Sequence, residues 1–167
     1  MLTDLVQIRR LGQQNKSENS RFRAYLRNHR HSDRRLRILA EEIESQIDCT
    51  ECANCCRVGE VPLIDRDIEK LAKFVGVTQD EFVRDYTQNA AEGDLILKRT
   101  EQAGCVFLHG NLCSVYEARP QNCANFPHLV RGAGSIDSRM WQFLKRTEYC
   151  PIVYNWMEAV KTDIGFR

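Results

Sequence analysis

The sequence predicts a mostly α-helical protein with a small β-hairpin, arranged as one irregular domain with an N-terminal helical arm. Three observations predict this fold class. Apolar residues recur at three- and four-residue steps through much of the chain. Short aliphatic runs gather between residues 95 and 116. Cysteine accounts for 8 of the 167 residues, which indicates loops stapled by metal. We expect a basic arm at residues 1–47 and a cysteine-cluster metal-binding domain at residues 48–167.

The first 40 residues are strongly basic. They hold ten Lys or Arg and three Asp or Glu, whereas residues 41–167 hold fourteen and twenty. Such an arm can contact nucleic acid, an anionic membrane surface or an acidic partner, or fold back onto its own acidic domain. Acidic residues interrupt the basic ones, and no aromatic or glycine spacing typical of nucleic-acid arms occurs. We therefore interpret the arm as a solvated helical face that is open to a protein partner, and we do not expect nucleic-acid binding.

The arm is expected to contain helices separated by two breaks. A short first helix is followed by residues 12–20, a polar stretch without an apolar period that we interpret as a linker. Residues 21–47 fit an amphipathic helix with a break near His31, after which Ser32 or Asp33 caps a second segment. That segment would present Cys49 at its carboxyl end.

Local signals predict the elements that follow the first cysteines. Asp65 is expected to cap a helix that ends at Gly76, and residues 78–81 have the form of a capping box. Further helices are predicted after Pro120, over residues 139–146 and over residues 151–161.

The aliphatic runs at residues 105–108 and 112–116 are separated by a turn sequence, His109-Gly110-Asn111. We interpret the two runs as a β-hairpin with Cys105 and Cys113 on paired strands. This arrangement would bring two thiolates within reach of one metal.

The sequence contains no run of about 18 apolar residues, and its amino terminus lacks the basic, long apolar and small-residue regions of a signal peptide. We therefore expect no membrane span and a cytoplasmic location. Thiols stay reduced in the cytosol, so metal thiolates explain the cysteines better than disulfides do.

Four cysteines fall within eight residues, in the order Cys49-x2-Cys52-x2-Cys55-Cys56. A two-residue gap lets the backbone wrap a metal and direct amide groups at the sulfurs, as in zinc knuckles and iron–sulfur loops. The adjacent pair argues against a lone zinc knuckle, because neighbouring side chains diverge. Either the two thiols serve two metals, or one is a ligand and the other packs.

The remaining cysteines are eight, ten and twenty-seven residues apart, so only the fold could gather them. We expect all four to be metal ligands. Together the eight could form two four-thiolate sites, or one four-thiolate cluster with four spare thiols. The distant four are Cys105, Cys113, Cys123 and Cys150.

Other polar residues near the cysteines are weaker candidates. His109 and His128 are possible nitrogen ligands, although we interpret both as residues of exposed turns. A polar shell could donate to the sulfurs or bind an anion. Its candidate members are Tyr116, Glu117, Arg119 and Asn125.

These motifs resemble the YkgJ-type cysteine cluster family of zinc- or iron-chelating domains. Residues 49–56 resemble its first motif, and residues 105–127, which include Tyr-x2-Arg-Pro and Phe-Pro elements, resemble its second. The resemblance covers about residues 49–127, with Cys150 as a further member. It implies metal chelation through the cysteines and implies no reaction.

We therefore expect a metal-binding protein that holds an iron–sulfur cluster such as 4Fe-4S, which we favour, or zinc, with a role in redox chemistry, sensing or metal handling. The alternative is a protein-modifying enzyme that resembles the lysine methylases among larger relatives and uses the metal as scaffold or electron carrier. The sequence contains no radical-enzyme cysteine loop, no glycine-rich nucleotide loop and no Ser/His/Asp set to support it. We do not expect the chain to be an enzyme by itself. A third possibility is that the metal only replaces missing core.

Overall fold

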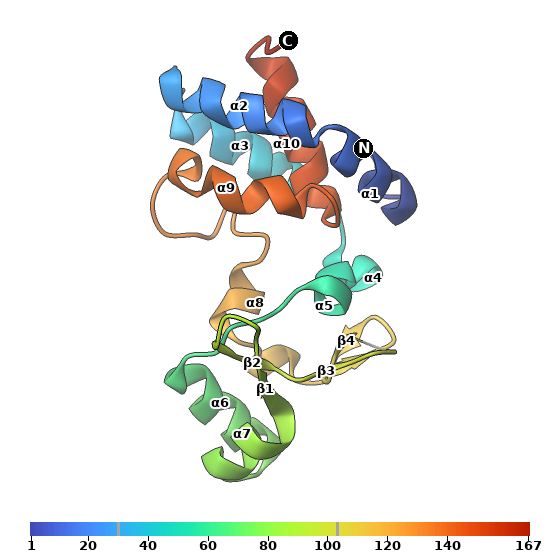
Figure 1. The fold of residues 1–167 in the computed structure, drawn as a ribbon, viewed down its shortest axis with the longest axis vertical. Helices are drawn as coiled ribbons and strands as arrows, with labels where there is room; N and C mark the ends of the chain where they lie inside the picture. Colours follow the sequence, from blue (N-terminus) through green and yellow to red (C-terminus); the bar gives the residue numbers. More distant parts are fainter. Residues whose placement is uncertain (30, 103) are drawn as a thin grey trace. The chain divides into compact units, whose positions relative to one another are not determined.

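The computed structural model describes residues 1–29, 31–102 and 104–167. It is mostly α-helical with small two-stranded hairpins (Figure 1), as the sequence predicts. Its contacts divide the chain into two compact units: unit 1 comprises residues 1–48 and 127–167, and unit 2 comprises residues 49–126. Residue 30, which belongs to the predicted basic arm, and residue 103 lie outside the described residues.

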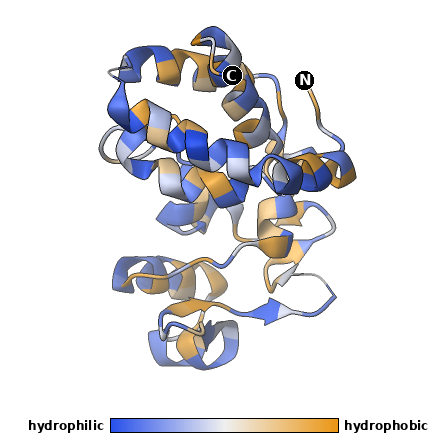
Figure 2. Ribbon diagram, turned by 45° about the horizontal axis from the view of Figure 1, so that its top comes forward, coloured by the Kyte–Doolittle hydropathy of each residue, from blue (hydrophilic) through white to orange (hydrophobic). Residues whose placement is uncertain are grey.

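Unit 1 is a helical bundle that combines both ends of the chain. In Figure 1 the helix α3 lies beside α10, and α2 lies beside α9. Figure 2 shows that these helices carry hydrophobic residues next to hydrophilic ones. The hydrophobic residues meet in a core whose largest members are aromatic, among them the fully buried Phe22, Phe143 and Trp156. The helices are α1 (Leu5–Gln14), α2 (Lys16–Asn28), α3 (Asp33–Glu44), α9 (Ile136–Arg146) and α10 (Pro151–Asp163).

The two ends share this core because α10 is buried on nearly every side and needs apolar partners from the N-terminal helices. Residues 127–167 therefore pack with residues 1–48 in the structure. The expected division placed them with the cysteine cluster, in a domain of residues 48–167 beside an arm of residues 1–47. The structure thus groups the C-terminal helices differently from the sequence-based division.

The polar stretch at residues 12–20 is helical rather than a linker, apart from a turn at Asn15. Tertiary contacts explain the difference. Gly12 is buried so closely against the main chain that an added Cβ would lie 2.6 Å from the carbonyl oxygen of Thr147. Asn19 is 1% exposed, and its side-chain amide donates to the Thr147 hydroxyl at 3.4 Å. The sequence prediction was wrong here because these polar residues face another helix.

The predicted break near residue 31 is confirmed, since α2 ends at Asn28 and Ser32 is the N-cap of α3. The expectation that this helix would present Cys49 at its carboxyl end was wrong. The helix α3 ends at Glu44, and Cys49 begins a separate short helix.

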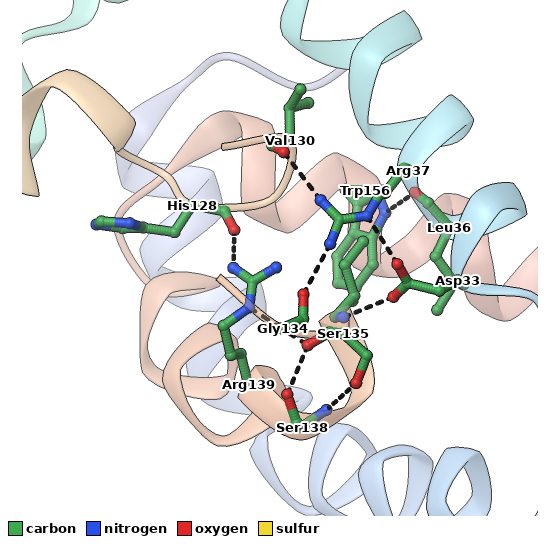
Figure 3. Close-up of polar contacts among 11 residues, drawn as sticks. Asp33, Leu36, Arg37, His128, Val130, Gly134, Ser135, Ser138, Arg139 and Trp156 are labelled. Carbon is green, nitrogen blue, oxygen red and sulfur yellow. Dashed lines mark hydrogen bonds and ion pairs between the residues drawn. The ribbon is translucent and has the colours of Figure 1, made fainter. Parts of the chain in front are cut away.

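The loop of unit 1 that precedes α9 is held by arginine side chains (Figure 3). Arg37 donates to the carbonyl oxygens of Val130 at 2.9 Å and Gly134 at 2.8 Å. The Asp33 carboxylate accepts from Arg37 at 2.7 Å and from the amide of Ile136 at 2.6 Å. Burial raises the pKa of Asp33, but these hydrogen bonds outweigh it and hold the pKa below its usual value.

Unit 2 packs two helices against short strands. Its core includes Leu71 of α6, Phe82 of α7 and Phe107. Within the described residues, none of the helices in either unit is long and apolar enough to span a membrane. The helical elements of unit 2 are α4 (Cys49–Cys52), α5 (Asn54–Val58), α6 (Asp65–Val75), α7 (Gln79–Tyr86), the 3-10 helix η1 (Tyr116–Ala118) and α8 (Gln121–Asn125).

Two of the three local signals of this unit are confirmed. The expectation that Asp65 would cap α6 was wrong, because Ile64 is the N-cap and Asp65 is the first helical residue. Gly76, with a φ of 83°, is the C-cap that ends this helix, as predicted. Thr78 and Glu81 form the predicted capping box at the start of α7, with the Thr78 amide donating to the Glu81 carboxylate at 2.8 Å.

Within the described residues that follow α7, the strands form three antiparallel hairpins, and their registers correct one prediction. Cys113 pairs with Leu108, whereas Cys105 pairs with Arg99. The two cysteines therefore lie on different hairpins, because the two-residue turn at Gly110, with a φ of 62°, closes the strands too soon to include Cys105. The pairs are β1 (Thr87–Asn89) with β2 (Leu95–Leu97), β3 (Arg99–Thr100) with β4 (Gly104–Cys105), and β5 (Leu108–His109) with β6 (Leu112–Cys113).

Candidate metal centre

The first cysteine motif forms two short helices that meet at Ala53. Ala53 is 4% exposed and has a φ of 46°, so the chain changes direction between α4 and α5. The Ala53 amide donates to the carbonyl oxygen of Cys49 at 2.9 Å, and the Cys56 amide donates to that of Ala53 at 3.1 Å. Cys49 is exposed, whereas Cys52 and the doublet are half-buried. The turn thus separates the first two thiols of the motif from the last two.

Three more half-buried cysteines of unit 2 come from three different elements. Cys105 lies on β4, Cys113 on β6 and Cys123 on α8. Cys105 and Cys113 pack against the hydrophobic core of the unit. A rigid part of the fold therefore supports these two thiols.

One thiol of the doublet, that of Cys56, has a lowered pKa. A hydrogen bond from the Cys55 side chain lowers the pKa of Cys56 from 9.0 to about 7, which outweighs the opposing effect of burial. The positive charges of Arg57, Arg99 and Arg119 lower it further. Cys56 is therefore partly ionised at neutral pH.

The distant thiols are less acidic. Burial raises the pKa of Cys123 to about 12, and the charges of Cys56, Cys105 and Cys113 add to this effect. Burial is also the main cause that raises the pKa of Cys105 and of Cys113, with a contribution from the charge of Cys56 in both cases. These four thiols therefore interact through their charges, so the fold brings them into one region.

Arginines surround this region, and sequence reasoning identified one of them. Arg119 was a candidate for the polar shell, and its guanidinium carbon lies 4.0 Å from the centre of the Tyr116 ring. Arg57 and Arg99 were missed. Arg99 donates to the carbonyl oxygen of Gly59 and, at 2.5 Å, to that of Arg57. The only sequence signal for Arg57 was its position directly after the doublet.

Two hydrogen bonds attach the helix that carries Cys123. The amide of Gln121 donates to the Asp67 carboxylate at 3.0 Å, and the Asn122 side chain donates to the carbonyl oxygen of Pro62 at 3.0 Å. They join α8 to the start of α6 and to the segment before it. Side-chain bonds to fixed partners thus hold Cys123 in unit 2.

The structure places Cys150 in unit 1, where it is 5% exposed and is the N-cap residue of α10. Its assignment as a ligand stays a prediction. His128 also belongs to unit 1, with a φ of 68°, and its carbonyl oxygen accepts from Arg139 while its ring points away from the other residues drawn (Figure 3). His109 is exposed next to its turn.

Across residues 1–29, 31–102 and 104–167, no group of three or more His, Cys, Asp or Glu is arranged to hold a metal ion as it stands. The thiols of unit 2 therefore share a region without forming a complete coordination shell. Their chemistry nevertheless fits a soft metal, because thiolates are the preferred ligands of zinc and of iron–sulfur clusters.

Residues 48–151 match the family model CxxCxxCC, whose description is "Putative zinc- or iron-chelating domain". The chain belongs to this family. The matched segment of this CxxCxxCC protein includes all eight cysteines, and the family's description supports metal binding through them. Searches of curated proteins and of solved structures gave no match.

Proposed function

We propose that this CxxCxxCC protein holds an iron–sulfur cluster, in preference to zinc, and uses it in redox chemistry, sensing or metal handling. The observation that carries the proposal is the charge interaction of the Cys56 thiol with thiols from three other elements. The charge of Cys56 raises the pKa of Cys105, Cys113 and Cys123, so the fold brings these three thiols near its sulfur.

The number of thiols is sufficient for either metal, since a structural zinc ion and a 4Fe-4S cluster each take four ligands and unit 2 contains seven cysteines. Charge favours the cluster, because a cluster with four thiolates is an anion and three arginines act on Cys56. Nearby charge and hydrogen bonds are among the factors that set the reduction potential of such clusters.

The proposed ligands begin with the four thiols that interact through charge. Cys49, Cys52 and Cys55 are further ligands supplied by the first motif. Cys150 completes the set, and its support is its inclusion in the matched segment. The four central ligands are Cys56, Cys105, Cys113 and Cys123.

Binding would change the thiols in two ways. Their side chains must converge, because no set of three is already arranged to hold an ion within the described part of the chain. They must also lose protons, since thiolates are the ligands and the pKa of Cys123 is about 12. Metal binding at neutral pH is therefore accompanied by proton release.

Anaerobic purification tests the proposal. The expected result is a brown protein with visible charge-transfer absorption, with iron and acid-labile sulfide present in cluster stoichiometry. The variant Cys123→Ser should lose most of the absorption, whereas Trp141→Phe, on the surface of α9, should keep it. A colourless protein with stoichiometric zinc would exclude the cluster, and a protein without either metal would exclude the function.

We further propose a cytosolic location, supported by the metal binding that the family's description assigns to these cysteines, since thiols that bind metal must stay reduced, as they do in the cytosol.

We also propose that the N-terminal helices bind an acidic protein. Among the described residues of this segment, several exposed arginines form no ion pair, including Arg9, Arg10, Arg21 and Arg27. Glutamine at these four positions should abolish the binding of an acidic polypeptide such as polyglutamate, and unchanged binding would contradict this.

A further inference from the structure

The side chain of Arg57 reaches from the first cysteine motif to the turn of the β5–β6 hairpin. Its Nη1 donates to the carbonyl oxygen of Cys52 at 2.8 Å. Its Nη2 donates to the carbonyl oxygen of Gly110 at 2.9 Å and to the side-chain oxygen of Asn111. One guanidinium therefore joins two segments that are more than fifty residues apart in sequence.

Asn111 makes the reciprocal connection. Its side-chain nitrogen donates to the carbonyl oxygen of Glu51 at 2.8 Å. The amide of Asn111 thus accepts from the motif through its oxygen and donates to it through its nitrogen. We call Arg57 and Asn111 the latch.

The latch connects two groups of proposed ligands, and neither of its two residues is itself a proposed ligand. Arg57 directly follows Cys56, and Asn111 is two residues before Cys113. Guanidinium hydrogen bonds are charge-assisted, and a planar fork fixes direction as well as distance. The separation between the motif and the Cys113 hairpin therefore depends on these two side chains.

A second contact holds the other hairpin against the same part of the motif. Gly104 has a φ of 82°, and a Cβ added there would lie 2.6 Å from the Arg57 Cα and 2.7 Å from the Cys56 carbonyl oxygen. The backbone of Arg57 is thus fixed by close packing, which leaves its side chain to set the position of the β5–β6 turn.

We propose that Arg57 and Asn111 are positioning residues of the metal site, which fix the geometry between the Cys49–Cys56 motif and Cys113. The proposal rests on the proposed function. It predicts that breaking the latch changes how the metal is coordinated more than how the protein folds, because Asn111 is exposed and lies in a turn. Residues that orient metal ligands typically change metal affinity about 10- to 100-fold when mutated.

Three variants separate the possible roles of the latch. Arg57→Lys keeps the positive charge and loses the fork. Asn111→Asp keeps an acceptor for Arg57 and loses the donor to Glu51, whereas Asn111→Ala loses both. Arg66→Lys, at an exposed position of α6, is the matched control for Arg57→Lys.

Cobalt(II), added anaerobically to the full-length metal-free protein, reports the geometry through its ligand-field and thiolate charge-transfer bands. Arg57→Lys and Asn111→Ala should bind as much cobalt as the wild type, with altered bands and release to a chelator about tenfold faster or more. Asn111→Asp should show a smaller change, and Arg66→Lys should match the wild type. Wild-type bands and release rates in both Arg57→Lys and Asn111→Ala would overturn the proposal.

The same variants distinguish failure of the latch from failure of the proposed function. The proposed function fails if the anaerobically purified wild type contains neither iron with sulfide nor zinc, and the latch is then tested by the alkylation rate of Cys113 in the metal-free protein. Faster alkylation in Asn111→Ala than in the wild type would support a latch that holds the hairpin. Equal rates would overturn it. Should Arg57→Lys fail to fold, Asn111→Ala carries both measurements.

Discussion

The indole nitrogen of Trp156 donates a hydrogen bond of 3.0 Å to the carbonyl oxygen of Leu36, which joins α10 to α3 (Figure 3). Both residues are buried. Trp156→Phe removes the donor and leaves space in the core, so we expect the free energy of unfolding to fall by about 1–3 kcal/mol. Urea denaturation measures the change. Trp141→Phe, at a position 58% exposed on α9, is the control and should stay within about 0.5 kcal/mol of the wild type.

A second prediction concerns the close approach of β4 to α5. Gly104→Ala forces a Cβ against the backbone of Arg57 at a φ of 82°. Gly93→Ala meets a similar φ of 91° with nothing within 4 Å, so it isolates the cost of the backbone conformation. We expect Gly104→Ala to be less stable than Gly93→Ala by about 1–3 kcal/mol, because overpacking adds to the strain. Equal unfolding free energies in urea would show that the packing is loose.

The acidity of Cys56 gives a prediction about pH. In the metal-free protein its pKa of about 7 means that alkylation by iodoacetamide should rise with a midpoint near pH 7, while Cys123 should react slowly until far higher pH. Cys55→Ala removes the hydrogen bond that contributes most to this shift and should move the midpoint toward 9. Peptide mass spectrometry at a series of pH values measures both rates.

The same shifts predict how pH changes the stability of the metal-free protein. Cys56 has a lowered pKa, so its contribution to the free energy of unfolding is present above pH 9 and is lost as the pH falls through about 7. Cys123 has a raised pKa, so its contribution is present below pH 9 and is lost as the pH rises toward 12. Removing Cys123 as Cys123→Ala should therefore weaken the loss of stability above pH 9 in urea denaturation. If Cys123→Ala lost as much unfolding free energy above pH 9 as the wild type, the raised pKa of Cys123 would not be the cause of that loss.

Serine substitutions test the ligand set. Cys123→Ser should remove most of the bound metal, because its thiol interacts with three other proposed ligands. Cys150→Ser should also lower the metal content if the sequence-based prediction holds. Metal analysis after anaerobic purification, together with a melting curve before and after chelator treatment, distinguishes the two. Full metal content in Cys150→Ser would make Cys150 a packing residue of unit 1.

Signals contained in a few neighbouring residues were sufficient to predict parts of unit 2. The sequence alone identifies two of them, because each depends on backbone groups within one helical turn. They are the capping box of Thr78 and Glu81 and the C-cap of α6 at Gly76. The cysteine motif at residues 49–56 was also identifiable, since its spacing is local.

Features that depend on distant contacts could not be predicted in the same way. Residues 12–20 are helical because Asn19 and Gly12 meet Thr147, which is more than a hundred residues away. The pairing of Cys105 with Arg99 depends on which of several short aliphatic runs become partner strands, and their local sequences do not decide this. Arg57 and Asn111 each bond the other's segment of the chain, and the two residues are 54 positions apart. Nothing in the residues next to either of them indicates this partner.

Three acceptors of the Arg57 and Arg99 side chains are main-chain oxygens, at Cys52, Gly59 and Gly110. Every residue type provides such an oxygen, so substitutions at most of these positions leave the acceptor in place. Adding or deleting a residue in the turn at Gly110 would instead move the acceptor away. Apart from Asn111, whose side chain belongs to the latch, and Gly110, whose φ is 62°, the segments that supply these oxygens should therefore tolerate a change of residue type far better than a change of length.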